Sequence, residues 1–498
     1  MGESWSKLLT DYSSSRMGET VRSWVGRKRK RDDDSDSQSE SNLVLEKTMR
    51  TPKRKKLAST AQYIYQALFK EGKNSDIKVL ALGKLWKLHR IYLCQSPYFA
   101  SMFSGAWKEA TEDFVRIEIV DPKINLDAMY IVLGSLYLDE VTLEPADVVS
   151  VLAAASLFQL DGLIDQCTEI MIETINTETV LTYYESSCEY GLQNVKEACF
   201  KWLLVNLLCH VCDCPKKLVQ IGVDLMTQLV KSPDLFVMQT EFSVYALLRY
   251  WVYLHVAPQW EGGSIQEALI ASQLYFQERD DDTPFLLTKE GSKYAPPFRA
   301  LRLRHLVDHH TDVQLLHSEH VLPPSWLHPA IYNNWNLMLR IDQGIDRGAK
   351  ELTFEEFSAD CLRCGRVIHN ETEHVWRWTG FNFGLDLVWT CDGRVLKVKR
   401  NQRSDSEVML SMQQRRHFMF RITLASLDEQ RQIKQTQSTG TKSMSFFKNE
   451  EVVLLVLDSE LTFPILVSVN LLTTCPIASL QDSPCPHAPA PCPHASIN

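Results

Sequence analysis

The chain has 498 residues, of which 45% are hydrophobic, so about two to four domains with buried cores are expected. The net charge of -9 is unevenly spread: residues 1–60 carry 14 Lys or Arg and 9 Asp or Glu, while the rest of the chain sums to -14. An acidic body argues against a large nucleic-acid surface, because phosphate binding needs clustered positive charge. Thirteen cysteines without an apolar leader favour free thiols in a reducing compartment.

Residues 1–60 are predicted to be a disordered arm, because the stretch DDDSDSQSE between two basic clusters cannot bury itself. Paired basic clusters on such an arm are typical of a nuclear import signal, and the alternative is a soluble charged tail. The start of the chain also fits the loose myristoylation pattern, which leaves modification of Gly2 open. The residues of the predicted import signal are Arg27, Lys28, Arg29, Lys30, Arg31, Lys53, Arg54, Lys55 and Lys56.

A small sheet flanked by helices, an α+β unit, is predicted over residues 61–175. Apolar residues alternate in IKVLA and resume after Gly83, which predicts two strands joined by a tight turn. Ser96-Pro97 predicts a helix start, and the alternation in 114–120 predicts a third strand. Further helices are predicted at 61–72, 89–95, 126–137, 146–158 and 162–175.

The remaining sequence divides by its periodicity. Residues 176–310 show paired amphipathic patterns, with a break at Gly191, and predict a helical module with its own core. Residues 340–475 are rich in aromatic and β-branched residues, with a hairpin signal at Asp392-Gly393, and predict a β-rich domain. The tail 476–498 repeats PCPHA and is predicted to be disordered, without a role that the pattern reveals.

The stretch SDIKVLALGKLWKLHRIYLCQSPYFASMF resembles a BTB (POZ) domain, and the helical segment after it resembles a BACK domain. Together with the basic clusters and the segment TGFNFG, the chain resembles the germ cell-less family over most of residues 50–470. The expected fold is therefore a multidomain α+β chain: BTB, all-α BACK-like module and β-rich C-terminal domain. The BTB resemblance rests on Ser75, Asp76, Ile77, Val79, Leu88, His89, Arg90, Leu93, Ser96, Tyr98, Phe99, Met102 and Phe103.

The resemblance implies a protein-interaction fold. BTB domains dimerise, and many bind cullin-3 and deliver a substrate for ubiquitylation. Their cullin contact often includes a hydrophobic-x-Glu motif after the helix that ends at Phe103 here, and Trp107-Lys108-Glu109 matches it; the alternative is an ordinary solvent loop. An exposed Trp is a plausible interface anchor. The family's charged pocket corresponds to Asp76 and Arg90, with a structural or dimer-related role.

Two other groups of residues compete with this interpretation. His89 and Cys94 could suggest a nucleophile and its base, but no orienting residue or oxyanion loop lies nearby in the sequence, so packing roles are favoured. The spacing of Cys361, Cys364, His369 and His374 resembles a zinc knuckle, although its last ligand would have to leave a strand. Free residues at a domain edge are the favoured alternative, and zinc binding stays open.

The leading hypothesis is a nuclear, non-enzymatic substrate adaptor of a cullin-3 ubiquitin ligase, promoting proteasomal degradation of its targets, with the β-rich domain holding the substrate. The expected partners are cullin-3, protein substrates, a second copy through the BTB domain, and proteins of the nuclear envelope or matrix. No cofactor, metal, nucleic acid or transmembrane segment is expected. The family implies a role in spermatogenesis and germ-cell development. The alternatives are a non-degradative scaffold or transcriptional regulator, and a zinc-dependent nucleic-acid binder.

Overall fold

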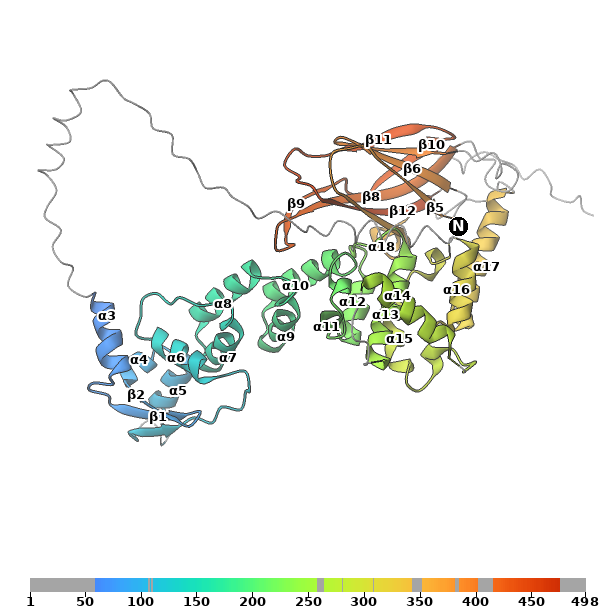
Figure 1. The fold of residues 1–498 in the computed structure, drawn as a ribbon. Coiled ribbons are helices and arrows are strands. Elements are labelled where there is room, and N and C mark those ends of the chain that lie inside the picture. Colours follow the sequence, from blue (N-terminus) through green and yellow to red (C-terminus); the bar gives the residue numbers. More distant parts are fainter. Residues whose placement is uncertain are drawn as a thin grey trace, which may run out of the picture. The chain divides into compact units, whose positions relative to one another are not determined.

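The computed structural model describes residues 59–105, 108, 111–257, 264–279, 281–307, 309–342, 352–380, 385–401 and 415–474. The chain divides into two compact units, one ending at Met171 and one beginning at Ile172 (Figure 1). Among the described residues, none of the helices combines the length and the apolar character that crossing a membrane requires.

Several sequence predictions concern residues outside this described set, and they stay predictions. These are Gly2, the basic clusters 27–31 and 53–56 with the acidic stretch between them, Trp107, Glu109, the FNFG segment 381–384 and the PCPHA tail.

The first unit has the predicted α+β fold. Strands β1 (Ile77–Ala81) and β2 (Lys84–Leu88) form an antiparallel hairpin, and β3 (Phe114–Arg116) pairs in parallel with β1. Leu82 and Gly83 between β1 and β2 have φ values of 50° and 74°, which a two-residue hairpin turn requires. The helices are α3 (Thr60–Ile64), continued by the π-helical η1 (Tyr65–Lys70), α4 (Arg90–Leu93), α5 (Pro97–Ser104), α6 (Leu126–Ser135), α7 (Val148–Phe158) and α8 (Asp161–Glu173).

The third strand is shorter than the pattern in 114–120 predicts. It ends at Arg116, because β1 ends at Ala81 and the chain then turns back at Gly83. The amide of Ile117 still donates to the Leu80 carbonyl at 2.9 Å, and no strand continues beyond it. Alternation in a sequence shows which side chains can be buried, but the partner strand decides where the ladder stops.

The second unit begins with a helical middle region built around α13 (Glu241–Val256). Every residue from Glu241 to Leu254 is buried, so α13 is enclosed on all sides. The other helices are α9 (Val180–Tyr190), α10 (Gln193–Asn206), α11 (Pro215–Leu218), α12 (Val223–Lys231), α14 (Ile265–Gln277), α15 (Ala295–Arg299), α16 (His310–Glu319), α17 (Pro324–Asp342) and α18 (Phe354–Asp360), with short 3-10 turns η3 (Val211–Asp213), η4 (Phe285–Leu287), η5 (Ser292–Tyr294) and η6 (Leu303–His305). Residues 311–339, which the sequence analysis left unassigned, lie in α16, α17 and the turn between them.

The strand-rich part is a sandwich of two antiparallel sheets. One has the order β10-β8-β12-β4, with β9 also on β8, and the other has the order β11-β7-β6-β5. Their inner faces share one core that includes Trp376, Trp389, Phe418 and Val467. The strands are β4 (Leu362–Ile368), β5 (His374–Gly380), β6 (Leu385–Asp392), β7 (Val395–Arg400), β8 (Arg415–Leu427), β9 (Ile433–Ser438), β10 (Lys442–Phe447), β11 (Glu451–Val456) and β12 (Ile465–Thr474).

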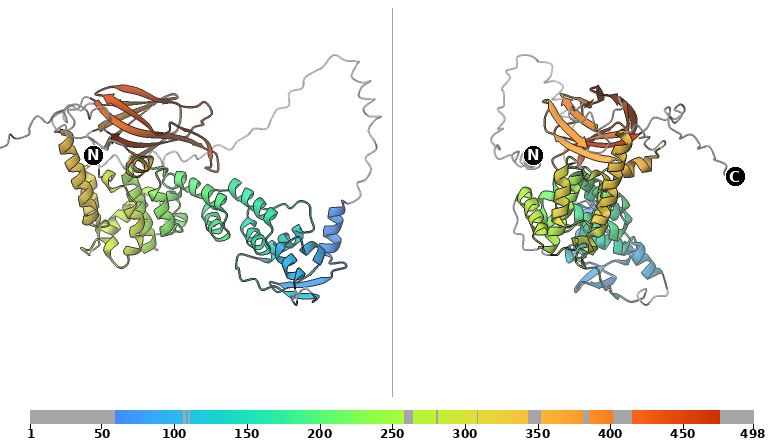
Figure 2. Two further views of the ribbon diagram at one scale, coloured as in Figure 1. Left: turned by 180° about the vertical axis from the view of Figure 1, so that it is seen from behind. Right: turned by 90° about the vertical axis from the view of Figure 1, so that its right-hand side faces the viewer.

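The helices and the sandwich of the second unit join along one seam, with the sandwich on one side of the helices (Figures 1 and 2). Gln239 and Gly365 exchange backbone hydrogen bonds of 2.8 and 3.2 Å, which adds the linker before α13 to the edge of β4. A Cβ on Gly365 would lie 1.9 Å from the Val237 carbonyl oxygen, so this approach needs glycine. Beside it, Arg363 pairs with Glu241 in full burial, with Nη2 2.5 Å from Oε1.

Candidate protein-interaction site

The helix α5 of the first unit is fixed at its start by Ser96. The Ser96 hydroxyl accepts from the Phe99 amide and donates to the Phe158 carbonyl at 2.6 Å, which links the helix cap to α7. The ring of Phe99 is fully buried and stacks on Phe158, with ring centroids 5.1 Å apart. Thus α5 is anchored to the core on its inner face, and the predicted start at Ser96-Pro97 is confirmed.

Phe103 lies near the end of α5, half-buried between two side chains. Its ring stacks on that of Phe99, with ring centroids 6.0 Å apart, and the guanidinium of Arg90 lies 4.7 Å from the Phe103 ring centroid. The same guanidinium donates to the Glu112 carbonyl at 2.6 Å. Arg90 therefore contacts Phe103, which precedes residues 106–110, and Glu112, which follows them, so both flanking residues are held from helix α4.

Asp76 lies just before β1, and its carboxylate accepts from the backbone amide of Arg90 at 2.9 Å. This bond caps the start of α4, whose first amides have no partner within the helix. The sequence predicts that Asp76 and Arg90 form a charged pocket. In the structure, the Asp76 carboxylate binds the backbone amide of Arg90 and so helps to position α4. Their part in dimerisation stays a prediction.

His89 has a structural role. Its Nε2 donates to the Lys73 carbonyl at 2.8 Å, and its Nδ1 faces the Tyr137 hydroxyl at 3.2 Å, which also accepts from the His89 amide at 3.0 Å. Burial raises the pKa of Tyr137 well above its usual value, so this hydroxyl keeps the proton that it donates to Nδ1. Both ring nitrogens are therefore occupied, whereas Cys94 is exposed. The packing role favoured for His89 agrees with these contacts.

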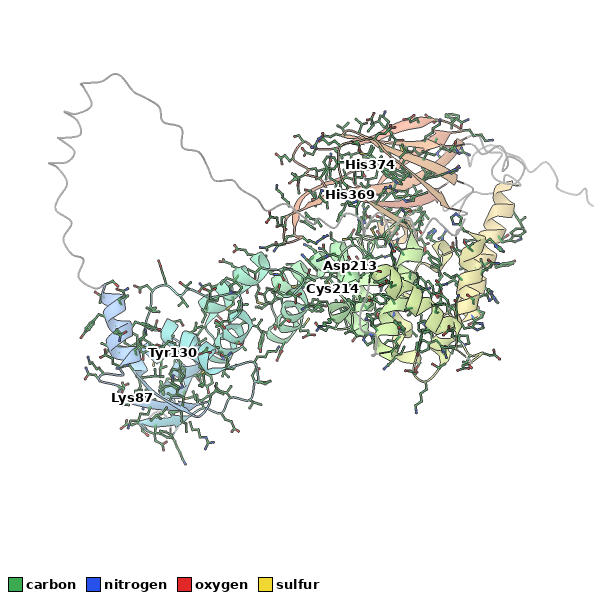
Figure 3. The ribbon with its side chains drawn as sticks, viewed as in Figure 1. Lys87, Tyr130, Asp213, Cys214, His369 and His374 are labelled. Carbon is green, nitrogen blue, oxygen red and sulfur yellow. The ribbon has the colours of Figure 1, made fainter. Side chains whose placement is uncertain are left out.

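The two cysteines and two histidines with zinc-like spacing lie in different surroundings. Cys361 is fully buried, and its sulfur accepts from Arg302 at 3.0 Å and from Asn470 at 3.2 Å. Cys364 lies in the sandwich core. His369 follows β4, and His374 begins β5 and contacts Asn370 (Figure 3). Within the described ranges no three His, Cys, Asp or Glu side chains are grouped to hold a metal. Cys361 and Cys364 are free thiols, as the favoured alternative expected, but both are buried, whereas an edge position had been predicted.

Sequence analysis missed one exposed apolar residue beside this site. Ile91 follows Arg90 in α4 and is 78% exposed, more than almost any other large apolar side chain described. An isolated isoleucine between residues that pack inward gives no periodic signal of exposure, because helix α4 has only four residues. Ile91, Arg90 and Phe103 together give this part of the unit the apolar and aromatic character of an interaction surface.

Comparison with known proteins relates this chain to one domain family and to several whole proteins. The model of the BTB/POZ domain family matches residues 65–175. The protein germ cell-less of Drosophila melanogaster is 44% identical over 448 residues, which are 85% of this chain and 79% of that protein. Germ cell-less protein-like 1 of Mus musculus is 41% identical over 449 residues, 89% of this chain and 85% of that protein.

The chain belongs to the germ cell-less family. The BTB fold of the first unit, the helical middle region and the strand-rich end are thus those of a germ cell-less protein with a BTB/POZ domain. A shorter likeness joins it to kelch repeat and BTB domain-containing protein 8 of Danio rerio, 30% identical over 189 residues, 38% of this chain and 30% of that protein. Family and domain together support a BTB-type adaptor or regulator that acts through protein–protein contacts and can dimerise.

Proposed function

We propose that this germ cell-less protein is a substrate adaptor of a cullin-3 ubiquitin ligase. Its BTB domain pairs with a second copy and binds cullin-3 through Phe103, Trp107 and Glu109, and its second unit binds the protein to be ubiquitylated. The ligase's other subunits carry out ubiquitin transfer, and the target is degraded by the proteasome.

The observation that carries this proposal is how Phe103 and Glu112, the described residues on either side of 106–110, are held. Phe103 is held between Phe99 and Arg90, and Arg90 also binds the Glu112 carbonyl where the chain returns. A segment whose flanking residues are held loses less conformational entropy when it binds a partner, which favours an interface role for Trp107 and Glu109. We propose that Trp107 anchors the interface through its large apolar area and that Glu109 sets the register.

The adaptor works by raising effective concentration. When the substrate and the ubiquitin-carrying subunits are held on one assembly, transfer becomes quasi-intramolecular. The rate then depends on the lifetime of the substrate on the adaptor, and the adaptor needs no catalytic residue of its own.

The place of action that we propose is the nucleus, at the nuclear matrix or envelope, in germ cells and during spermatogenesis. The support is the pair of basic clusters, 27–31 and 53–56, and the names of the relatives, which refer to germ cells. Replacing the basic residues of both clusters by alanine should move a fluorescent fusion of the chain out of the nucleus. Unchanged nuclear fluorescence would remove the import signal.

A cullin-3 pull-down with the full chain tests the ligase contact. Trp107→Ala and Glu109→Lys should each lower cullin-3 recovery at least tenfold, because both side chains are proposed to be buried in the complex. Glu118→Lys makes the same charge change at an exposed position after β3 and should leave recovery within twofold of the parent.

Two outcomes would count against the proposal. Full recovery with both loop variants would show that cullin-3 binds elsewhere. No recovery with the parent chain, under conditions in which the BTB domain is dimeric, would favour a non-degradative scaffold or transcriptional regulator that acts through the BTB dimer.

A further inference from the structure

Helix α10 and the five-stranded sheet leave a cleft between them in the second unit, here named the seam cleft. It has a volume of about 240 Å³, with Leu204 and Phe236 on the helical side and Ala425 and Leu466 on the sheet side. A contact beside the cleft joins the two layers: the Trp202 indole of α10 donates to the Gln430 carbonyl at 3.4 Å. The walls are therefore fixed by packing that does not depend on a ligand.

The size of the seam cleft is that of a binding pocket. Packed layers within one unit normally leave few voids larger than a water molecule, and a cavity of about 150 Å³ already admits a benzene ring. Phe236, Ala425 and Leu466 of the lining belong, with Cys209, to a small apolar cluster, and each of the three is at most 7% exposed. A cleft of this volume with such a lining fits one large aliphatic or aromatic side chain.

An unmatched cation in the lining gives the seam cleft a preference for a negative partner. Lys201 of α10 is exposed at the lining, and its ammonium has no ion pair with any residue in the described part of the chain. Arg421 of β8 donates to Asp234 at 2.6 Å, while its Nε is buried and lacks a hydrogen-bond partner among the described residues. Arg421 and Asp234 thus balance each other within the lining, and among the described lining residues the ammonium of Lys201 leaves one unmatched positive charge for an incoming carboxylate.

The strand at the margin favours an extended polypeptide over a small molecule. β9 contributes Ile433 and Thr436 to the lining and, among the described strands, pairs only with β8. Ile433 is 42% exposed, so apolar surface continues outward from the cleft along an edge strand. Edge strands bind extended peptides through backbone hydrogen bonds, while an adjacent pocket selects a side chain.

We propose that the seam cleft binds an extended acidic segment of a partner protein, with one large apolar side chain in the cleft and a neighbouring carboxylate on Lys201. This inference rests on the proposed adaptor role and names the class of substrate segment that the second unit takes. The apolar side chain supplies the affinity and the carboxylate sets the register.

Fluorescence anisotropy with the full chain tests the inference. The probes are labelled ten-residue peptides in which one central tryptophan, phenylalanine, leucine or alanine is flanked by aspartates, with a second set flanked by lysines. The acidic peptides with a large apolar centre should bind at least tenfold more tightly than the alanine peptide and the lysine set. Raising the salt concentration should weaken their binding.

Variants of the lining make the test specific. Thr423→Trp, which fills the cleft from β8, should weaken binding at least tenfold, and Lys201→Glu should weaken it about three- to tenfold. Lys231→Glu makes the same charge change at an exposed position outside the lining and should leave binding within twofold. A melting curve shows whether Thr423→Trp is folded. If that variant does not fold, Lys201→Glu still tests the proposal, because it alters only a surface charge.

The outcomes separate this inference from the ligase contact. If no acidic peptide exceeds its alanine counterpart, or if folded Thr423→Trp and Lys201→Glu bind as the parent does, the seam cleft is not the site. Peptide binding needs no cullin-3. If Trp107→Ala binds the acidic peptides as the parent does, the result supports the seam cleft, whether or not this variant still recovers cullin-3.

Discussion

The two units differ in how they bury polar groups. Among the described residues of the first unit, the buried polar side chains are His89 and Ser96, both of which hydrogen-bond to uncharged groups. The second unit instead buries acid–base pairs, Glu241–Arg363 and Glu319–Arg249. A buried charge is costly unless every donor and acceptor is matched. The first unit is therefore held mainly by apolar packing, and the second depends on a few particular partners.

The pair of Glu241 and Arg363 shows what this matching requires. Nε and Nη2 of Arg363 donate to Glu241, and Nη1 donates to the carbonyls of Val230 and Ser232 at 2.8 and 2.9 Å. Burial by itself would raise the pKa of Glu241, but Arg363 and the Arg302 amide outweigh it and hold that pKa below its usual value. Glu241 thus stays ionised at the seam between α13 and β4.

Removing one partner of this pair should have the largest effect on stability. Glu241→Ala leaves Arg363 buried without a counter-charge, which should lower the free energy of unfolding of the second unit by about 3–5 kcal/mol. Hydrogen exchange measured by mass spectrometry should show faster exchange in α13 and β4 and unchanged exchange in β1 and α7. Glu241→Leu combined with Arg363→Met should recover most of the loss; equal losses in the single and double variants would refute the charge argument.

A methyl group at the seam should have the next largest effect. Gly365→Ala would press its Cβ against the Val237 carbonyl and separate the linker from β4, lowering the stability of the second unit by up to about 3 kcal/mol. Gly162→Ala in α8 meets nothing within 4 Å and should raise stability by about 0.5–1 kcal/mol, because alanine favours the helix. Thermal unfolding of both variants checks this; a neutral Gly365→Ala would mean that the linker and β4 do not need their close contact.

Acid should weaken the second unit through His305. This side chain is fully buried, its Nε2 donates to the Asp360 carbonyl at 2.7 Å, and burial, aided by Arg304, lowers its pKa to about 3. Because only the unfolded chain takes up the proton near pH 6.5, the contribution of His305 is complete above that pH and declines as the pH falls toward 3. At pH 5 the loss should be about 2 kcal/mol.

His305→Gln keeps an amide donor and has no titratable group, so its stability should fall less than that of the parent between pH 7 and pH 5. Denaturant unfolding at the two pH values measures the difference. Parallel pH profiles for the two chains would show that His305 does not carry the acid sensitivity.

Periodic patterns made much of the fold predictable. The hairpin at Gly83, the helix start at Ser96-Pro97, the break at Gly191 and the hairpin at Asp392-Gly393 all lie where local sequence predicts them, because turns and caps need particular residues. The helix α17 was missed: its sequence begins with prolines and contains Pro329, which obscure a helical pattern.

The site was less predictable than the fold. The BTB resemblance predicted Phe103, Asp76 and Arg90 as site residues. It did not predict that Arg90 binds the Glu112 carbonyl and packs on Phe103, because these contacts join segments that no single sequence period relates. Nothing in the sequence pairs Glu241 with Arg363, which are 122 positions apart.

Apolar periodicity and turn residues act over a few positions, so they were enough to predict the α+β first unit, the helical middle and the β-rich end, while the family followed from the resemblance of longer stretches. The partners of the buried charges, the glycine contact at β4 and the seam cleft are visible only in the folded molecule, because each depends on distant segments that meet once the layers pack.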